Sequence, residues 1–155
     1  MDTPRVIKFR GKTPSYGEEG GKWVYGNLFT IGIDEKNLVG LAIVPFNHEY
    51  KDGSLHELMV VGKTVGQFTG MHDANGKEIY EDDIVKVVIP INAFTQEVWR
   101  YRKVVYSGRG FEFVDKNNTP ICDVVGASGS PKYYVIGNVH DDLELLNQEE
   151  TRHDH

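Results

Sequence analysis

One stretch of the sequence combines basic and aromatic side chains, the residue types that contact phosphates and stack on bases. It runs Trp99-Arg100-Tyr101-Arg102 and continues into Lys103. On a β-strand the two arginines share one face and the two aromatics share the other, because successive side chains point to opposite sides. The spacing therefore indicates a binding site for a protein or a nucleic acid. An amphipathic strand that buries its aromatics and holds its arginines in solvent has the same pattern, and the pattern alone favours that structural interpretation.

A second group of residues has the chemistry to hold a divalent cation. Carboxylates cluster between Asp73 and Asp83, with Glu78, Glu81 and Asp82 between them. Hard cations such as Mg²⁺ prefer oxygen ligands of this kind, so a metal-dependent hydrolase or nuclease is one alternative function. A solvated turn, in which a carboxylate accepts backbone N–H bonds, explains the same cluster and is the favoured interpretation. We therefore expect no metal and no other cofactor.

Other catalytic motifs fail at identifiable positions. Gly62-Lys63-Thr64 resembles the end of a phosphate-binding loop, but Glu57 stands where that loop needs its first glycine. The six histidines are scattered, and no two have the spacing of zinc ligands on one helical face. Since no nucleophile, base or metal set is matched, we expect a protein that is not an enzyme.

Composition narrows the class of protein. The chain has 155 residues, a formal net charge of −6 and a single Cys, which excludes a disulfide framework. No apolar run approaches the ~20 residues that span a bilayer, and residues 1–10 lack the apolar stretch of a secretory signal. The acidic balance disfavours a domain devoted mainly to nucleic acid. We expect a cytoplasmic protein that does not bind membranes.

Short strands separated by turns must position these groups. Runs of β-branched and aromatic residues recur at intervals of about ten residues, each bounded by Gly, Pro or Asn. The clearest are 6–10, 22–29, 38–44, 84–89, 98–106 and 133–139. The pattern predicts a mainly β fold with little helix beyond one acidic turn at 141–146.

The strongest turn signal is Asn75-Gly76, inside the segment 73–77. Asn and Gly both tolerate a positive φ, which a type I′ turn requires at its two central positions. The sequence therefore predicts a β-hairpin with Met71 on one side of the turn and Ile79 on the other.

Three parts of the chain carry a family resemblance. The first joins 7–12 to 21–28, the second joins 64–70 to 73–85, and the third joins 134–140 to 143–146. In this order they resemble the YopX family of phage and prophage proteins, whose biochemical role is unassigned and which supplies no catalytic residues to transfer. The resemblance implies an N-terminal β region over 1–70, a C-terminal SH3-like barrel over 71–147, and a polar tail over 148–155.

The same resemblance gives structural roles to several residues. Gly66, Gly70 and Gly76 would bend the backbone between the two β parts, with Asn75 beside Gly76 in the turn. Asp83 would brace the turn before the first strand of the barrel.

Two departures from the family pattern bear on these turns. Asp82 stands where the family has Gly, which leaves open whether this position has a positive φ. Asp141-Asp142 replaces an Asn-Pro pair, which predicts a less rigid final turn.

The leading functional hypothesis is a non-catalytic binding module of phage or prophage origin, acting in the cytoplasm of the bacterial host. Its partner would be a host or phage protein or a nucleic acid, bound through Trp99, Arg100, Tyr101 and Arg102. One alternative is the metal-dependent hydrolase built on the Asp73–Asp83 carboxylates. Another is a structural or assembly protein, a homo-oligomer whose edge strands pair between copies.

Overall fold

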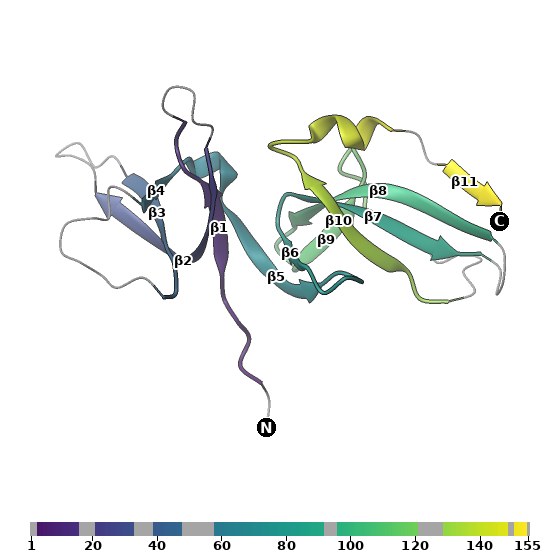
Figure 1. The fold of residues 1–155 in the computed structure, drawn as a ribbon, viewed down its shortest axis with the longest axis horizontal. Helices are drawn as coiled ribbons and strands as arrows, with labels where there is room; N and C mark the ends of the chain where they lie inside the picture. The colour runs from purple at the N-terminus through teal and green to yellow at the C-terminus, as the bar shows by residue number, and fades with distance from the viewer. Residues whose placement is uncertain are drawn as a thin grey trace. The chain divides into compact units, whose positions relative to one another are not determined.

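The computed structural model describes residues 3–15, 21–32, 39–47, 58–91, 96–120 and 129–148, together with the backbone of 151–154. In this part of the chain the regular structure is antiparallel β-strand with short 3₁₀ helices, so the predicted mainly β fold is confirmed (Figure 1). None of the helices described here is long and apolar enough to cross a membrane. The chain divides into two compact units, an N-terminal unit over Met1–Gly70 and a C-terminal unit over Met71–His155.

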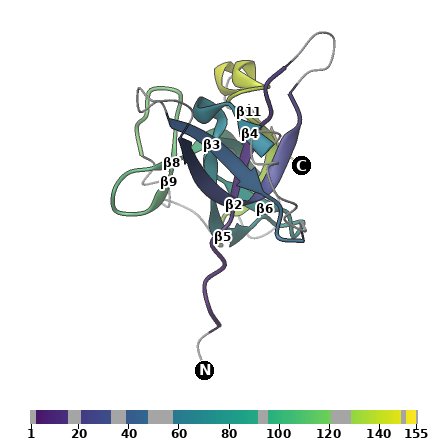
Figure 2. The same ribbon diagram turned by 90° about the vertical axis from the view of Figure 1, so that its left-hand side faces the viewer.

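The N-terminal unit contains five successive strands of an antiparallel sheet, in the order β4-β3-β2-β1-β5. Figures 1 and 2 show β3 and β2 as neighbouring ribbons within it. The strands are β1 (Phe9–Lys12), β2 (Trp23–Gly32), β3 (Val39–Val44), β4 (Met59–Val60) and β5 (Gly66–His72).

Close backbone packing at Gly11 fixes the core of this sheet. A Cβ atom at Gly11 would lie 3.1 Å from both Ile43 Cδ1 and Val60 Cβ. Because Ile43 and Val60 are buried, a larger residue at Gly11 would push them out of place.

The segment Gly62-Lys63-Thr64 forms the 3₁₀ helix η2 (Gly62–Thr64) and packs against β1. The Thr64 hydroxyl donates to the Val61 carbonyl at 2.6 Å and accepts from the Lys12 N–H at 2.8 Å. These bonds within the protein give the threonine a structural role in place of the phosphate contact that its motif suggested.

The C-terminal unit contains a second antiparallel sheet with the order β10-β7-β8-β11, and β9 also pairs with β8. Its core joins Ile79, Val85, Val87, Ile89 and Val104. The elements are β6 (Glu78–Tyr80), β7 (Asp83–Pro90), β8 (Gln96–Tyr106), β9 (Phe111–Val114), β10 (Lys132–Asn138), η3 (Leu143–Asn147) and β11 (Thr151–Asp154).

The described strands of this unit form an open sheet. Strand β10 is at one edge, β9 and β11 are at the other, and β6 lies beside β5 instead of joining the two edges. No closed barrel is found among these residues, so the SH3-like barrel expected over 71–147 is not confirmed.

The polar tail expected over 148–155 contains a strand. Strand β11 pairs with Gln96–Trp99 of β8. Strand β9 occupies only Lys103–Tyr106 of the same edge, so the backbone groups of Gln96–Trp99 are available to β11. Because this pairing uses backbone N–H and C=O groups, a polar sequence can form it.

The turn at Asn75-Gly76 is present, but its type differs from the prediction. The Gly76 N–H donates to the Asp73 carbonyl at 3.0 Å, and only Gly76, with φ +82°, has a positive φ. This is a type I turn followed by one left-handed residue. The Asp73 side chain accounts for it, since its Oδ1 accepts the N–H groups of Asn75 and Lys77, both at 2.9 Å.

A second turn has the same construction. Asp115 Oδ1 accepts the N–H groups of Asn117 at 2.8 Å and Thr119 at 2.9 Å, and Asn118 has the positive φ of +62°. The Asn118 N–H donates to the Asp115 carbonyl, as Gly76 does to Asp73. Two five-residue segments with different sequences therefore form one kind of turn around an aspartate.

Asp73 differs from Asp115 in one contact. Its second oxygen, Oδ2, accepts the N–H of Val135 in β10 at 2.9 Å, and its side chain is 8% exposed. Burial acts to raise the pKa of Asp73. The hydrogen bonds from Val135, Lys77 and Asn75, with the positive charge of Lys77, outweigh it and lower the pKa below the ordinary value of 3.8.

The structure predicts that Asp73→Asn destabilises the C-terminal unit by about 1–3 kcal/mol, because an amide cannot accept all three N–H bonds. In the native protein the lowered pKa means that the unfolded state binds more protons below pH ~4. The stabilisation is therefore complete above that pH and is lost as the pH falls through the pKa of the folded carboxyl. Urea unfolding at pH 3 to 7 measures both effects.

Asp115→Asn is the matched control, since it alters a turn of the same construction whose aspartate makes no bond to β10. We expect a smaller loss of stability from it than from Asp73→Asn. Equal losses from the two variants would show that the Val135 bond contributes nothing.

Candidate functional site

Strand β8 places its two arginines on the core face of the sheet. Arg100 lies opposite Val87 and Arg102 opposite Val85, and directly opposed residues of an antiparallel pair share a face. Arg102 is only 6% exposed. The expectation of buried aromatics with arginines in solvent is therefore wrong. Val104, two residues beyond Arg102, is fully buried and fixes which face turns inward.

The aromatics of β8 lie on the opposite face, where they are half-buried. Tyr101 is opposite Lys86, whose Nζ lies 4.6 Å from the centroid of the Trp99 ring. The Trp99 and Tyr101 rings meet edge to face at 5.1 Å between centroids. Trp99 and Lys86 therefore contact each other, and a partner would meet an already packed aromatic pair.

Two strands pair with β8 on the edge away from β7. Strand β11 pairs with Gln96–Trp99 and β9 pairs with Lys103–Tyr106. Arg100, Tyr101 and Arg102 of the predicted site lie between these two segments of β8.

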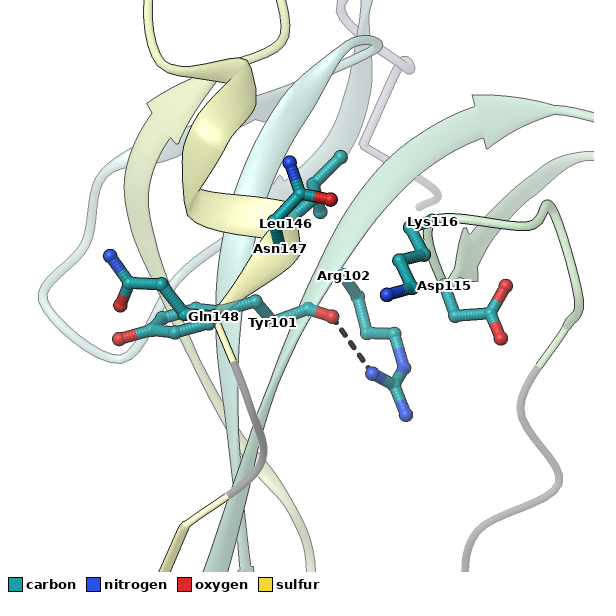
Figure 3. Close-up of a pocket in the computed structure, with 7 residues that line it drawn as sticks. All are labelled: Tyr101, Arg102, Asp115, Lys116, Leu146, Asn147 and Gln148. Carbon is teal, nitrogen blue, oxygen red and sulfur yellow. Dashed lines mark hydrogen bonds between the residues drawn. The ribbon is translucent and has the colours of Figure 1, made fainter.

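A cavity of about 220 Å³ lies beside Tyr101 and Arg102 of β8 (Figure 3). Its walls come from β8, from the turn after β9 and from the end of η3. The lining residues are Tyr101, Arg102, Asp115, Lys116, Leu146, Asn147 and Gln148.

Two of the lining residues, Arg102 and Lys116, are cationic. The Arg102 guanidinium donates to the Tyr101 carbonyl at 2.8 Å. Figure 3 shows the Asp115 carboxylate pointing away from Lys116. Hydrogen bonding by the Thr119 backbone is the main cause that lowers the pKa of Asp115, with further contributions from Asn117 and the charge of Arg102. This pocket has the chemistry to hold a carboxylate or another small anionic group.

The pocket includes only part of the predicted set. Tyr101 and Arg102 line it, whereas Trp99 contacts Lys86 and Arg100 faces the core side.

Sequence reasoning missed Lys116 and the end of η3. The segments 115–119 and 73–77 both begin with Asp and have Asn at their third position. This shared pattern was a usable signal for the turn that contains Asp115 and Lys116. No local pattern could place Leu146 or Gln148 beside β8.

The predicted structural turn residues occupy the following positions. Gly70 has φ +86°, and no atom lies near the place of a Cβ. Glycine is therefore favoured at this position by the positive φ and not by lack of space. Gly66 lies opposite Arg10 and has no positive φ. The Tyr80 N–H donates to Asp83 Oδ2 at 2.7 Å, and Asp83 is fully buried at the start of β7.

The carboxylates that suggested a metal site have other partners. Glu78 accepts the Tyr80 hydroxyl at 2.7 Å, and Asp82 lies 3.1 Å from Nε2 of His140. Across the described ranges no three His, Cys, Asp or Glu side chains are grouped to hold a metal ion. Asp82 has φ +67°, so this aspartate adopts the left-handed conformation that the sequence left open.

The final turn is bonded more extensively than its Asp141-Asp142 pair suggested. Asn138 Oδ1 accepts the N–H groups of His140 and Asp141, at 3.0 and 3.1 Å. The Asn138 N–H donates to Asp142 Oδ2 at 3.2 Å. A Cβ at Gly137 would lie 2.5 Å from Asp142 Oδ2 and 2.9 Å from Asp142 Cβ, so this packing needs a glycine.

These features define a protein of two antiparallel β units with side-chain-supported turns. The family model described as YopX protein matches residues 8–147, and the chain therefore belongs to the YopX family. The resemblance drawn from the sequence is confirmed. Neither a search of curated proteins nor one of solved structures gave a match.

The positive φ at Asp82 predicts a distinct order of stability among variants. Asp82→Ala keeps a Cβ in the left-handed region but removes the polar side chain. It should destabilise the protein by about 1–2 kcal/mol. Asp82→Gly also loses the His140 contact but removes the backbone strain, so it should be more stable than Asp82→Ala by about 1 kcal/mol. Urea unfolding compares the two.

His140→Ala is the control that removes only the side-chain contact. If Asp82→Ala is as stable as Asp82→Gly, the backbone at this position carries no strain.

Proposed function

We propose that this chain is a non-catalytic binding module of phage or prophage origin that acts in the cytoplasm of the host. Its C-terminal unit binds a short acidic segment of a protein partner at the pocket beside β8. The supporting observation is that the pocket beside β8 is lined by two predicted site residues, Tyr101 and Arg102, together with the cationic side chain of Lys116. The SH3-like character of residues 71–147 belongs to this proposal, since such small β domains bind through loops beside a sheet edge.

The charge of the pocket limits what can bind there. A carboxylate of a bound segment would meet the cationic side chains of Arg102 and Lys116. The proposed ligand is therefore a short segment that ends in, or contains, an acidic side chain.

Charge favours a short acidic segment over a nucleic acid at this site. Residues 1–70 contain as many basic as acidic residues, so the acidic excess of the chain lies in residues 71–155. A polynucleotide must be neutralised at many phosphates, and an acidic unit opposes that. The pocket has Arg102 and Lys116 beside the Asp115 carboxylate, so its charge suits one small anionic group and not a polyanion.

Lys116→Glu should weaken partner binding about tenfold or more, because it replaces an attractive charge by a repulsive one at the pocket. Lys116 is exposed, so its reversal leaves the fold intact, whereas Arg102 is buried. The measurement is capture of a partner from a bacterial host lysate, followed by calorimetric titration of the identified partner.

Arg109→Glu is the matched control, since Arg109 is exposed in the 107–110 turn and does not line the pocket. Tyr101→Ala should weaken binding as Lys116→Glu does. The proposed site is wrong if both pocket variants bind the partner as tightly as Arg109→Glu does.

A further inference from the structure

The Asn75-Gly76 pair has a chemical reactivity besides its place in a turn. In an unfolded chain, the backbone nitrogen that follows an asparagine can attack the carbonyl carbon of the side chain, Cγ. Glycine hinders this attack least, because it has no side chain beside the nitrogen. Asn75 and Gly76 are both exposed to water in the folded protein. The pair therefore has the composition of a site for spontaneous deamidation, a reaction that makes asparagine thermolabile in proteins.

The reaction needs only the chain and water. The Gly76 nitrogen forms a bond to Asn75 Cγ, and the side-chain nitrogen leaves as ammonia, taking up the proton that the Gly76 nitrogen loses. Water then opens the resulting five-membered succinimide at either of its two carbonyl groups. One product is an ordinary aspartate at position 75. The other is an isoaspartate, in which the main chain runs through the former side chain.

The folded turn holds the attacking nitrogen away from Cγ. The Gly76 N–H donates to the Asp73 carbonyl at 3.0 Å. The residues on either side are fixed as well, since Asp73 Oδ1 accepts the N–H groups of Asn75 and Lys77, both at 2.9 Å. The third residue of a type I turn has a ψ of about 0°. Closing the succinimide ring requires a rotation about this torsion that brings the Gly76 nitrogen beside Cγ, and the turn prevents that rotation.

Contacts with β10 keep the turn in this conformation. Asp73 Oδ2 accepts the Val135 N–H at 2.9 Å, and the Ala74 N–H donates to the Tyr133 carbonyl at 2.8 Å. Rotation at Asn75 would break the Gly76 bond and draw the Lys77 N–H away from Asp73 Oδ1. Asp73 is only 8% exposed, and a buried carboxylate that loses its donors is costly. The reactive conformation therefore requires the whole turn to open.

We propose that Asn75 is a deamidation site that the Asp73 turn protects in the folded protein and that reacts when this turn opens. The isoaspartate product lengthens the main chain by one carbon between the N–H groups of residues 75 and 77. Asp73 Oδ1 can then no longer accept both of them. Either product also places a new negative charge close to the Asp73 carboxylate. A turn that has reacted therefore closes less well and is held less firmly to β10. This inference does not depend on the pocket beside β8.

The test follows Asn75 in the full chain at pH 8 and 37 °C, once in buffer and once unfolded in guanidinium chloride. Mass spectrometry of the tryptic peptide 64–77, in which Asn75 is the only asparagine, measures the conversion of amide to acid. Deamidation should be about tenfold slower or more in the folded protein, because only the small population with an open turn reacts. A synthetic 64–77 peptide, kept in buffer and in denaturant, measures any effect of the denaturant itself.

Asp73→Ala removes all three contacts of the carboxylate and should raise the Asn75 rate in buffer toward the rate of the unfolded chain. Asp115→Ala is the matched control, since it removes the corresponding contacts of the other aspartate turn and should leave the Asn75 rate unchanged. Circular dichroism checks that each variant is folded. Asp73→Ser replaces Asp73→Ala if the latter unfolds, because a hydroxyl can still accept one backbone N–H.

Three results would overturn the proposal. The first is equal rates of Asn75 deamidation in the folded and the unfolded chain. The second is the absence of deamidation at Asn75 in denaturant. The third is a folded Asp73 variant that reacts at the wild-type rate.

Discussion

The Asp73 carboxylate is the contact on which the arrangement of the C-terminal unit depends. Its two oxygens accept three backbone N–H groups, two within its own turn and one from β10. The neighbouring Ala74 N–H adds a bond to the Tyr133 carbonyl of the same strand. Strand β10 pairs in turn with β7, whose Val85 and Val87 lie in the core. A buried carboxylate is costly without such donors, so the turn, the edge strand and the core stabilise one another.

Both units also bury an arginine within a sheet. Arg10 and Arg102 are each 6% exposed, and each is held by a neighbour on its own sheet. The Trp23 ring covers the first, and the Tyr101 carbonyl accepts a bond from the second. In both places the long aliphatic stem can pack with apolar neighbours while the guanidinium reaches a polar or aromatic group. The same residue type therefore has a structural role in both sheets.

The sequence was sufficient for the mainly β character and the family, but not for the SH3-like barrel, because strand periodicity and turn residues are local signals. It was insufficient where side chains compete for the backbone or where distant segments meet. Asn75-Gly76 marked a turn, but the Asp73 side chain selected its type. The alternation in 99–102 was visible, but only Val104 showed which face turns inward. Gln148 and Lys116 reach the pocket through tertiary packing, which no local pattern records.

The pairing of β11 with β8 has a consequence for the order in which the chain can fold during synthesis. Gln96–Trp99 acquires its outer neighbour only when Thr151–Asp154 has been made. At about 5–20 residues per second, the intervening fifty or so residues take a few seconds to translate. During that interval the unpaired backbone of β8 is open to any extended segment nearby. A nascent chain of this protein therefore passes through a stage in which its longest strand can recruit a foreign strand.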